Sequence, residues 1–343
     1  MKTNSTQYAP ASIKQIQNTL YRERQKSKPI VHASNIADEI LEVIGMLNTH
    51  PFVQQIVHRK GEVPSVMCYT NEQIVDMNHF LKSLKSPILG INRTFNMGTY
   101  YVTAIVYKTE RVIRKKKKDY PIIVGPILLH KDATTATYKQ FLSHIADQLG
   151  VVNEVELNMP SSSSFEFGSY DEKALTNAIE QVFPNASRRL CSKHIKDNLQ
   201  FHLQNKVGLN ISERTEIIEK FFGNEGLACA NDTFDFEKRK HALSTLYEKY
   251  PDSKKYLETV TNRINKFVYT PKRKNDEVKL WTNNNAESAN HIFKWKPKKA
   301  PELIEKLYMC INYQFINLKS SLYFSGEYEL CGRYKAYSVS EQK

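Results

Sequence analysis

The spacing of hydrophobic and polar residues separates helical from extended stretches of the chain. Residues 35–60 place apolar side chains at helical spacing, which predicts helices there. A further helix is predicted over residues 71–84, NEQIVDMNHFLKSL, with Asn71 as its N-terminal cap. Helical spacing returns over residues 134–151 and again through residues 210–265. These stretches predict that helices make up much of the fold.

An extended pattern lies between these helices. Residues 86–98, 99–109 and 121–131 are rich in β-branched and aromatic side chains and predict three successive strands. Pro126 is expected to break the third strand, because proline removes a backbone donor. A short strand at residues 165–169, an amphipathic helix and a strand that enters a helix follow. Successive strands followed by an alternating part predict a mixed α/β sheet.

Composition and charge indicate the kind of partner. The chain has 343 residues, of which 41% are hydrophobic and 25% charged, as in globular proteins. Its 49 lysines and arginines outnumber 36 acidic residues, so the net charge is +13 and the pI about 9.3. Such an excess favours a polyanion, and we expect DNA rather than a small-molecule substrate.

Several sequence features bear on the cellular location. No apolar run is long enough to predict a membrane helix, and the first residues lack the apolar centre of a secretory signal. Five irregularly spaced cysteines do not suggest a disulfide framework. We therefore expect a nuclear protein, or else a cytoplasmic one, without a membrane partner. A homodimer is an open alternative.

Basic clusters give candidate nucleic-acid contacts. Lysine and arginine side chains bind phosphates without reading the sequence, and an exposed tryptophan between lysines can stack on a base. Each cluster can also be a solvated loop, and the first one equally resembles a nuclear localisation signal. The candidate residues are Lys115, Lys116, Lys117, Lys272, Arg273, Lys274, Lys294, Trp295 and Lys298.

Three segments together resemble the Mutator-like element (MULE) family of DDE transposases. They are GINRTFNMGTYYVT at 90–103, FGSYDEKALTNAIEQVFPNASRRLCSKH at 167–194, and WTNNNAESANHIFK at 281–294. The resemblance covers roughly residues 60 to 310, and it is the order and spacing of the segments that make it specific.

The resemblance implies an RNase H-like mixed sheet flanked by helices, with a helical insertion before the last catalytic helix. The regions then expected are an N-terminal helical or linker region at 1–60 and an RNase H-like core at 61–205. A helical insertion follows at 206–270. A basic loop, a glutamate-bearing helix and a helical tail make up 271–343.

The resemblance also implies a site in which three carboxylates hold two divalent cations for phosphoryl transfer on DNA. The position of the first acid is Asn92, that of the second is Tyr170, and the third matches Glu287. An amide brings no charge, and a phenol with a pKa near 10 is a poor magnesium ligand. Asp171 replaces the second acid only if the turn shifts by one residue.

Cys191 and His194 form a C-x-x-H pair that also matches the family pattern. Their spacing places both side chains on one helical face. One interpretation is half of a zinc site, but a structural zinc site needs four ligands. The favoured interpretation is a pair that packs beside the former active site.

Three functions remain open on the sequence. The leading hypothesis is a transposase-derived DNA-binding protein whose metal-dependent strand cleavage is impaired or lost. The second is an active or partly active transposase that uses Mg²⁺ or Mn²⁺ with Asp171, Glu287 and an unrecognised third acid. The third is a nuclear interaction scaffold. Whether the chain is an enzyme is therefore uncertain, because two of three expected acids are replaced.

Overall fold

The fold is taken from a computed structural model of the chain. It describes residues 33–58, 62–84, 87–97, 100–114, 118–150, 165–269, 280–282, 299–323 and 334–336.

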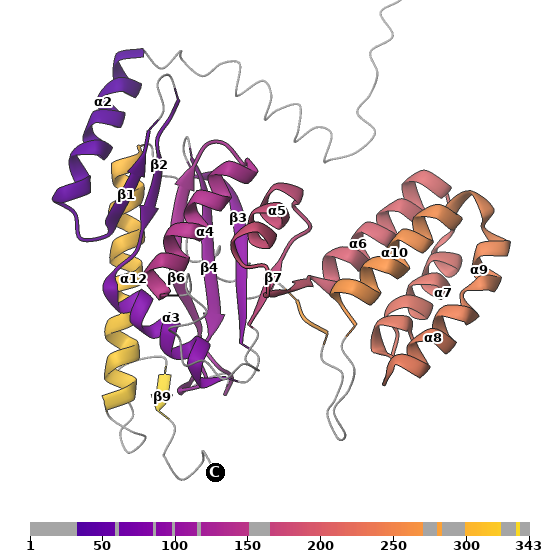
Figure 1. The fold of residues 1–343 in the computed structure, drawn as a ribbon. Coiled ribbons are helices and arrows are strands. Elements are labelled where there is room, and N and C mark those ends of the chain that lie inside the picture. Colours follow the sequence, from indigo (N-terminus) through magenta and orange to yellow (C-terminus); the bar gives the residue numbers. More distant parts are fainter. Residues whose placement is uncertain are drawn as a thin grey trace, which may run out of the picture.

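A seven-stranded mixed sheet forms the centre of the molecule, in the order β1-β2-β6-β4-β3-β7-β8 (Figure 1). Neighbours from β1 to β3 are antiparallel, whereas β7 pairs in parallel with both β3 and β8. This arrangement confirms the predicted α/β class with its RNase H-like mixed sheet. The strands are β1 Val53–Val57, β2 Ser65–Cys68, β3 Ile88–Met97, β4 Tyr100–Lys108, β6 Ile122–His130, β7 Glu166–Ser169 and β8 Ser187–Leu190.

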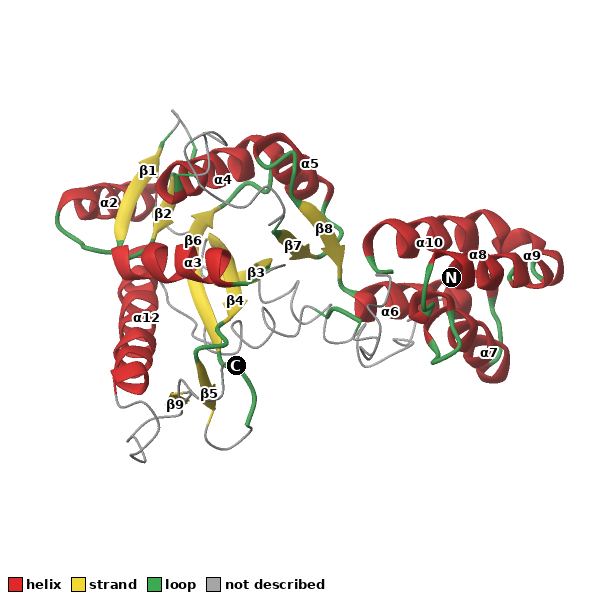
Figure 2. Ribbon diagram, turned by 60° about the horizontal axis from the view of Figure 1, so that its bottom comes forward, coloured by secondary structure: helices red, strands yellow, loops and turns green. Residues whose placement is uncertain are grey.

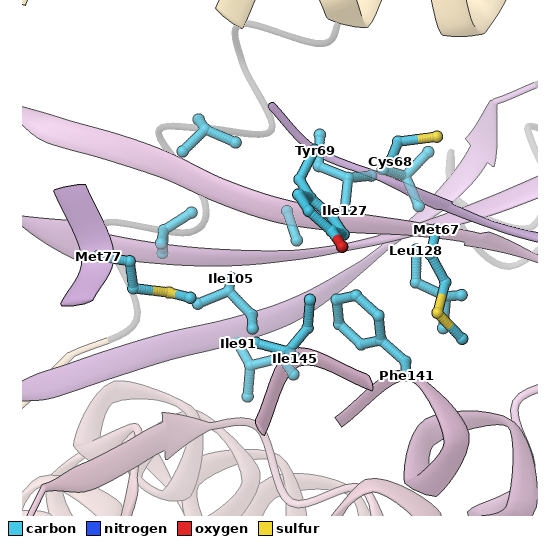
Figure 3. Packing of buried hydrophobic residues seen from close by; sticks show 14 of the residues in the cluster. Met67, Cys68, Tyr69, Met77, Ile91, Ile105, Ile127, Leu128, Phe141 and Ile145 are labelled. Atoms are coloured by element: carbon cyan, nitrogen blue, oxygen red, sulfur yellow. The ribbon is translucent and has the colours of Figure 1, made fainter. Parts of the chain in front are cut away.

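Helices cover the sheet and bury its apolar side chains. Phe141 and Ile145 of α4 pack toward Ile91 and Ile105 of the central strands (Figure 3). Near the β6 side, Gln314 of α12 accepts a hydrogen bond from Val124 N and donates one to Ile122 O. The helices around the sheet are α2 Ala33–Gly45, α3 Asn71–Ser83, α4 Thr135–Leu149, α5 Lys173–Val182 and α12 Ala300–Tyr323. A short pair, β5 Val112–Arg114 with β9 Tyr334–Ala336, forms a second sheet.

A cluster of helices beside the sheet has a hydrophobic core of its own (Figures 1 and 2). Phe221, Phe236 and Leu257 are among its fully buried residues. The cluster confirms the helical pattern predicted over residues 210–265. It also includes the preceding helix, α6, whose Ile195 and Leu199 belong to the same core. Its elements are α6 Ser192–His202, the π-helical turn η2 Leu203–Val207, α7 Ile211–Phe222, α8 Thr233–Ala242, α9 Ser244–Lys249 and α10 Lys254–Phe267, with 3-10 turns at η3 Leu227–Cys229 and η4 Pro251–Ser253.

The structure corrects three predictions of local structure, the first two of which concern the N-terminal part of the described chain. The helix expected through residue 60 ends earlier, and β1 is instead an edge strand held by backbone pairing with β2. The cap of α3 is Thr70 rather than Asn71, because the Thr70 side chain accepts the Gln73 amide in a capping box.

Pro126 does not break β6, contrary to the prediction. The ladder between β4 and β6 changes register between Ala104 and Val106, opposite Pro126, so the missing amide falls at an irregularity of the ladder.

Among the described residues, the helices are all too short or too polar to span a membrane.

Candidate functional site

The parallel ladder between β3 and β7 ends next to two predicted catalytic positions, Asn92 in the middle of β3 and Tyr170 just after β7. The two strands run in parallel, and the last pair of their ladder is Ile91 with Ser169. Asn92 is the next residue of β3, and Tyr170 is the first residue after β7. Because paired residues of neighbouring strands share a face and side chains alternate along a strand, Asn92 lies on the face that also carries Gly90 and Gly168. The register therefore places side by side the two positions at which the resemblance expects acids.

Asn92 is the buried residue of this site. Its side chain is only 3% exposed, and its Oδ1 has no hydrogen-bond partner among the described residues. Leaving a buried acceptor unpaired costs about 1–3 kcal/mol. The amide oxygen is thus an acceptor whose hydrogen-bonding capacity the described fold leaves unused.

Trp281 covers the same face next to these positions. A Cβ atom on residue 168 would overlap its indole ring, so only glycine fits beneath it. The Trp281 carbonyl accepts hydrogen bonds from Ser192 N at 3.1 Å and Ser192 Oγ at 2.9 Å. These contacts fix the chain against β7 six residues before Glu287 in the sequence.

Tyr170 is half-buried and packs on the first turn of α6. Its ring meets that of His194 edge to face, with centroids 4.1 Å apart and an interplanar angle of 82°. Cys191 is buried and immediately precedes α6. Within the described parts of the chain, no group of three or more histidine, cysteine or acidic side chains is placed to hold a metal ion. The contact of His194 with the Tyr170 ring and the burial of Cys191 support the interpretation of Cys191 and His194 as packing residues.

Asp171 faces the helical cluster rather than Asn92. Its carboxylate forms an ion pair with Arg263 of α10, and both side chains are partly exposed. The neighbouring residue, Glu172, points into the layer between the sheet and α4. There it accepts the Tyr138 hydroxyl at 3.0 Å and lies 3.6 Å from Arg93. Neither carboxylate is therefore directed at Asn92 in the described structure.

A buried polar network on the opposite face of β3 was missed by the sequence analysis. Arg93 stacks over Tyr101 at 4.8 Å, and Thr103 Oγ1 lies 2.8 Å from His130 Nε2. Burial lowers the pKa of His130 to about 4, so its imidazole is neutral at pH 7. The sequence did hold a signal for this network. Side chains alternate between the two faces of a strand, so Arg93, the residue after Asn92, must face the side opposite to Asn92.

Arg188 supports the turn after β7. Its guanidinium donates to Ser169 Oγ at 3.2 Å, and Ser169 Oγ in turn donates to the Tyr170 carbonyl at 2.8 Å. Its other side stacks over Phe267 of α10 at 5.3 Å. Burial lowers the pKa of this arginine, although arginine keeps its charge at neutral pH. The same residue thus contacts both the turn and the helical cluster.

The remaining predicted residues lie outside the described residues. They are Glu287, Lys115, Lys116, Lys117, Lys272, Arg273, Lys274, Lys294, Trp295 and Lys298.

The side chains present at the first two positions do not fit a two-cation centre. Such a centre needs negatively charged oxygen ligands between its cations. Asn92 offers a neutral oxygen, Tyr170 offers a phenol engaged with an imidazole ring, and Asp171 is paired with a guanidinium. A single carboxylate at Glu287 would leave most of the cation charge uncompensated.

Comparison with known families supports the resemblance over part of the chain. Residues 169–301, less than half of the chain, match the family model described as transposase, Mutator family. The match includes Tyr170, Asp171 and Glu287, whereas Asn92 precedes it. No curated protein matches the chain significantly. The predicted resemblance to Mutator-like transposases is thereby confirmed for this segment.

Proposed function

We propose, from the Mutator-family transposase domain over residues 169–301, that this chain is a transposase-derived DNA-binding protein whose strand-cleaving site is impaired or inactive. The observation that carries the proposal is the register of β3 and β7. The last pair of the ladder, Ile91 with Ser169, directly precedes Asn92 and Tyr170, the positions at which the resemblance expects two carboxylates. On this proposal, the fold around the site is retained while the negative charge of its first two positions is lost.

The shifted-acid alternative requires Asp171 to replace the lost second carboxylate. Asp171 follows Tyr170 in the turn and is held by Arg263 on α10. To ligate a cation it would have to leave that ion pair and move toward Asn92. The alternative therefore costs an interaction that the described structure makes.

DNA is the partner that the charge of the chain favours. The net charge of +13 supplies phosphate contacts that need no base reading. On this proposal Mg²⁺ or Mn²⁺ matters only to a protein in which the carboxylates are restored. A nuclear location and a homodimer stay predictions from the sequence.

Nicking of supercoiled plasmid with Mg²⁺ or Mn²⁺ tests the loss of cleavage. The natural protein is expected to leave the plasmid intact, and an Asn92→Asp/Tyr170→Asp double variant is expected to nick it. Adding Glu287→Gln to that double variant should abolish nicking, and circular dichroism should confirm that all three proteins fold.

Nicking by the natural protein would contradict the proposal. If Asp171→Asn then removed that activity, the chain would be an active transposase that uses the shifted acid. If no variant nicked although the natural protein bound DNA, the assignment of Asn92 and Tyr170 as catalytic positions would be wrong.

A further inference from the structure

Helix α10 carries an exposed polar and basic stripe. Its exposed residues recur with helical spacing, so they lie along one side of the helix. The opposite side is buried in the core of the helical cluster through Leu257, Val260 and Ile264. The stripe consists of Lys255, Thr259, Asn262 and Lys266, and the exposed residues Lys254, Glu258 and Asn265 border it on one side.

The charge of the helical cluster is unevenly distributed. Along α10, KKYLETVTNRINKF, four basic residues accompany one acidic residue. Along α7, ISERTEIIEKFF, three acidic residues accompany two basic ones, and Glu219 and Glu225 line a hollow at its C-terminal end. The excess of basic residues is thus a property of α10 and is not shared by α7 of the same cluster.

The C-terminal half of α10 lies at the ends of β7 and β8. Arg263 pairs with Asp171, which directly follows Tyr170. Phe267 lies under the guanidinium of Arg188, a residue of β8. In Figure 1, α10 lies on the side of the helical cluster that is closer to the sheet. The stripe therefore leads toward the site formed by Asn92 and Tyr170.

The length and chemistry of the stripe suit a nucleic-acid backbone. Lys255 and Lys266 are eleven residues apart, which corresponds to about 16 Å along a helix. The Asn262 side-chain amide between them is a donor of the kind that commonly contacts phosphate and sugar oxygens, whereas the Thr259 hydroxyl donates to the Lys255 carbonyl at 2.8 Å. The sequence continues after α10 into the predicted DNA-binding cluster at 272–274, so basic residues follow one another along the chain.

We propose that the stripe of Lys255, Thr259, Asn262 and Lys266 on α10 binds the phosphate backbone of duplex DNA and guides it to Asn92 of β3 and Tyr170 after β7. The inference rests on the proposed function, which takes DNA as the partner. It assigns to the helical cluster a role in holding DNA beside the site. That role does not depend on cleavage, and it is served equally by an inactive site.

Salt-dependent binding of the full chain to a blunt duplex oligonucleotide tests the proposal. The test variant is Lys255→Gln/Lys266→Gln. The control is Lys220→Gln/Lys238→Gln, which removes the same charge from exposed lysines of α7 and α8. Fluorescence anisotropy between about 50 and 200 mM salt gives the slope of log K against log salt.

Each lost phosphate contact lowers the magnitude of that slope by about 0.9 on duplex DNA. The α10 variant is therefore expected to lose about 1.8 from the slope and to bind roughly tenfold more weakly, while the control keeps the natural slope. Circular dichroism of both variants excludes unfolding as the cause.

Equal slopes for the two variants would overturn the role of α10 while leaving DNA binding by the chain intact. Failure of the natural protein to bind the duplex would instead overturn DNA binding itself, and the α10 proposal with it. Binding to anionic phospholipid vesicles in preference to duplex would also contradict the proposal.

Discussion

Asn92 differs from an aspartate at the same place in charge rather than in size. The amide fits a position that is 3% exposed, and it needs no counter-charge there. A carboxylate in the same place would be desolvated unless cations or hydrogen-bond donors compensated it, and its pKa would rise. Tyr170 differs in shape as well, since its ring occupies space against His194. Restoring the first acid is therefore a smaller structural change than restoring the second.

His130 should make the stability of the protein sensitive to acid. Its folded-state pKa is about 4 because of burial, below the ordinary value of 6.5. As the pH falls from 6.5 to 4, the unfolded chain takes up a proton that the folded chain does not. The free energy of unfolding should therefore decrease by about 3 kcal/mol over that window.

Urea denaturation at pH 7 and pH 4 measures this decrease, with His130→Gln as the comparison. Other groups titrate in both proteins, so only the difference between them reports on His130. We expect the natural protein to lose more stability than the variant on acidification, whatever the variant costs at pH 7. Equal losses would mean that His130 is protonated readily in the folded protein.

At the scale of elements, the sequence predicted most helices and strands, but not which elements pair or pack with each other. Helices α4 and α5 were visible because a helix with one buried face repeats its apolar positions, and strands β3 and β4 were visible from their β-branched and aromatic residues. The edge strand β1 was mistaken for a helix, since pairing with β2 rather than its own residues makes it extended.

The contact of Trp281 with Gly168 illustrates the same limit within the site. The sequence singled out both segments through the resemblance, but more than a hundred residues separate them, and no local pattern shows that they touch. The Asp171–Arg263 pair is a second case, because each residue belongs to an ordinary local pattern. Local propensity predicts elements, and only packing decides which side chains of distant elements meet.

The ion pair between Asp171 and Arg263 should contribute a small coupling between the turn after β7 and α10. Its side chains are 42% and 30% exposed, so solvent screens the attraction. A double-mutant cycle of Asp171→Asn and Arg263→Gln in chemical denaturation is expected to give about 0.5 kcal/mol. The more exposed pair of Glu72 and Lys319 serves as a control and should give less. A coupling no larger than that of the control would show that the pair does not hold Asp171 away from the site.

At the scale of the whole molecule, two hydrophobic cores meet at β8. The larger core includes Phe141 and the central strands, and the second includes Phe221 and the helices of the cluster. Leu190 is a residue of β8, yet it belongs to the second core. The site lies where these two cores adjoin, since Asp171 and Arg188 both contact α10. The placement of α10 relative to the sheet thus depends on contacts such as these at the junction of the two cores.

Separate cores should open separately in hydrogen exchange. Phe141 and Phe221 are both fully buried, and replacing either by leucine should cost about 1–2 kcal/mol. Because each side chain packs within its own core, Phe221→Leu should speed exchange in α7 and α10 and leave β3, β4 and β6 protected. Phe141→Leu should do the reverse, and mass spectrometry of peptides from both regions measures this. Faster exchange in both regions from either substitution would show one cooperative unit, in which the junction at β8 transmits unfolding from one core to the other.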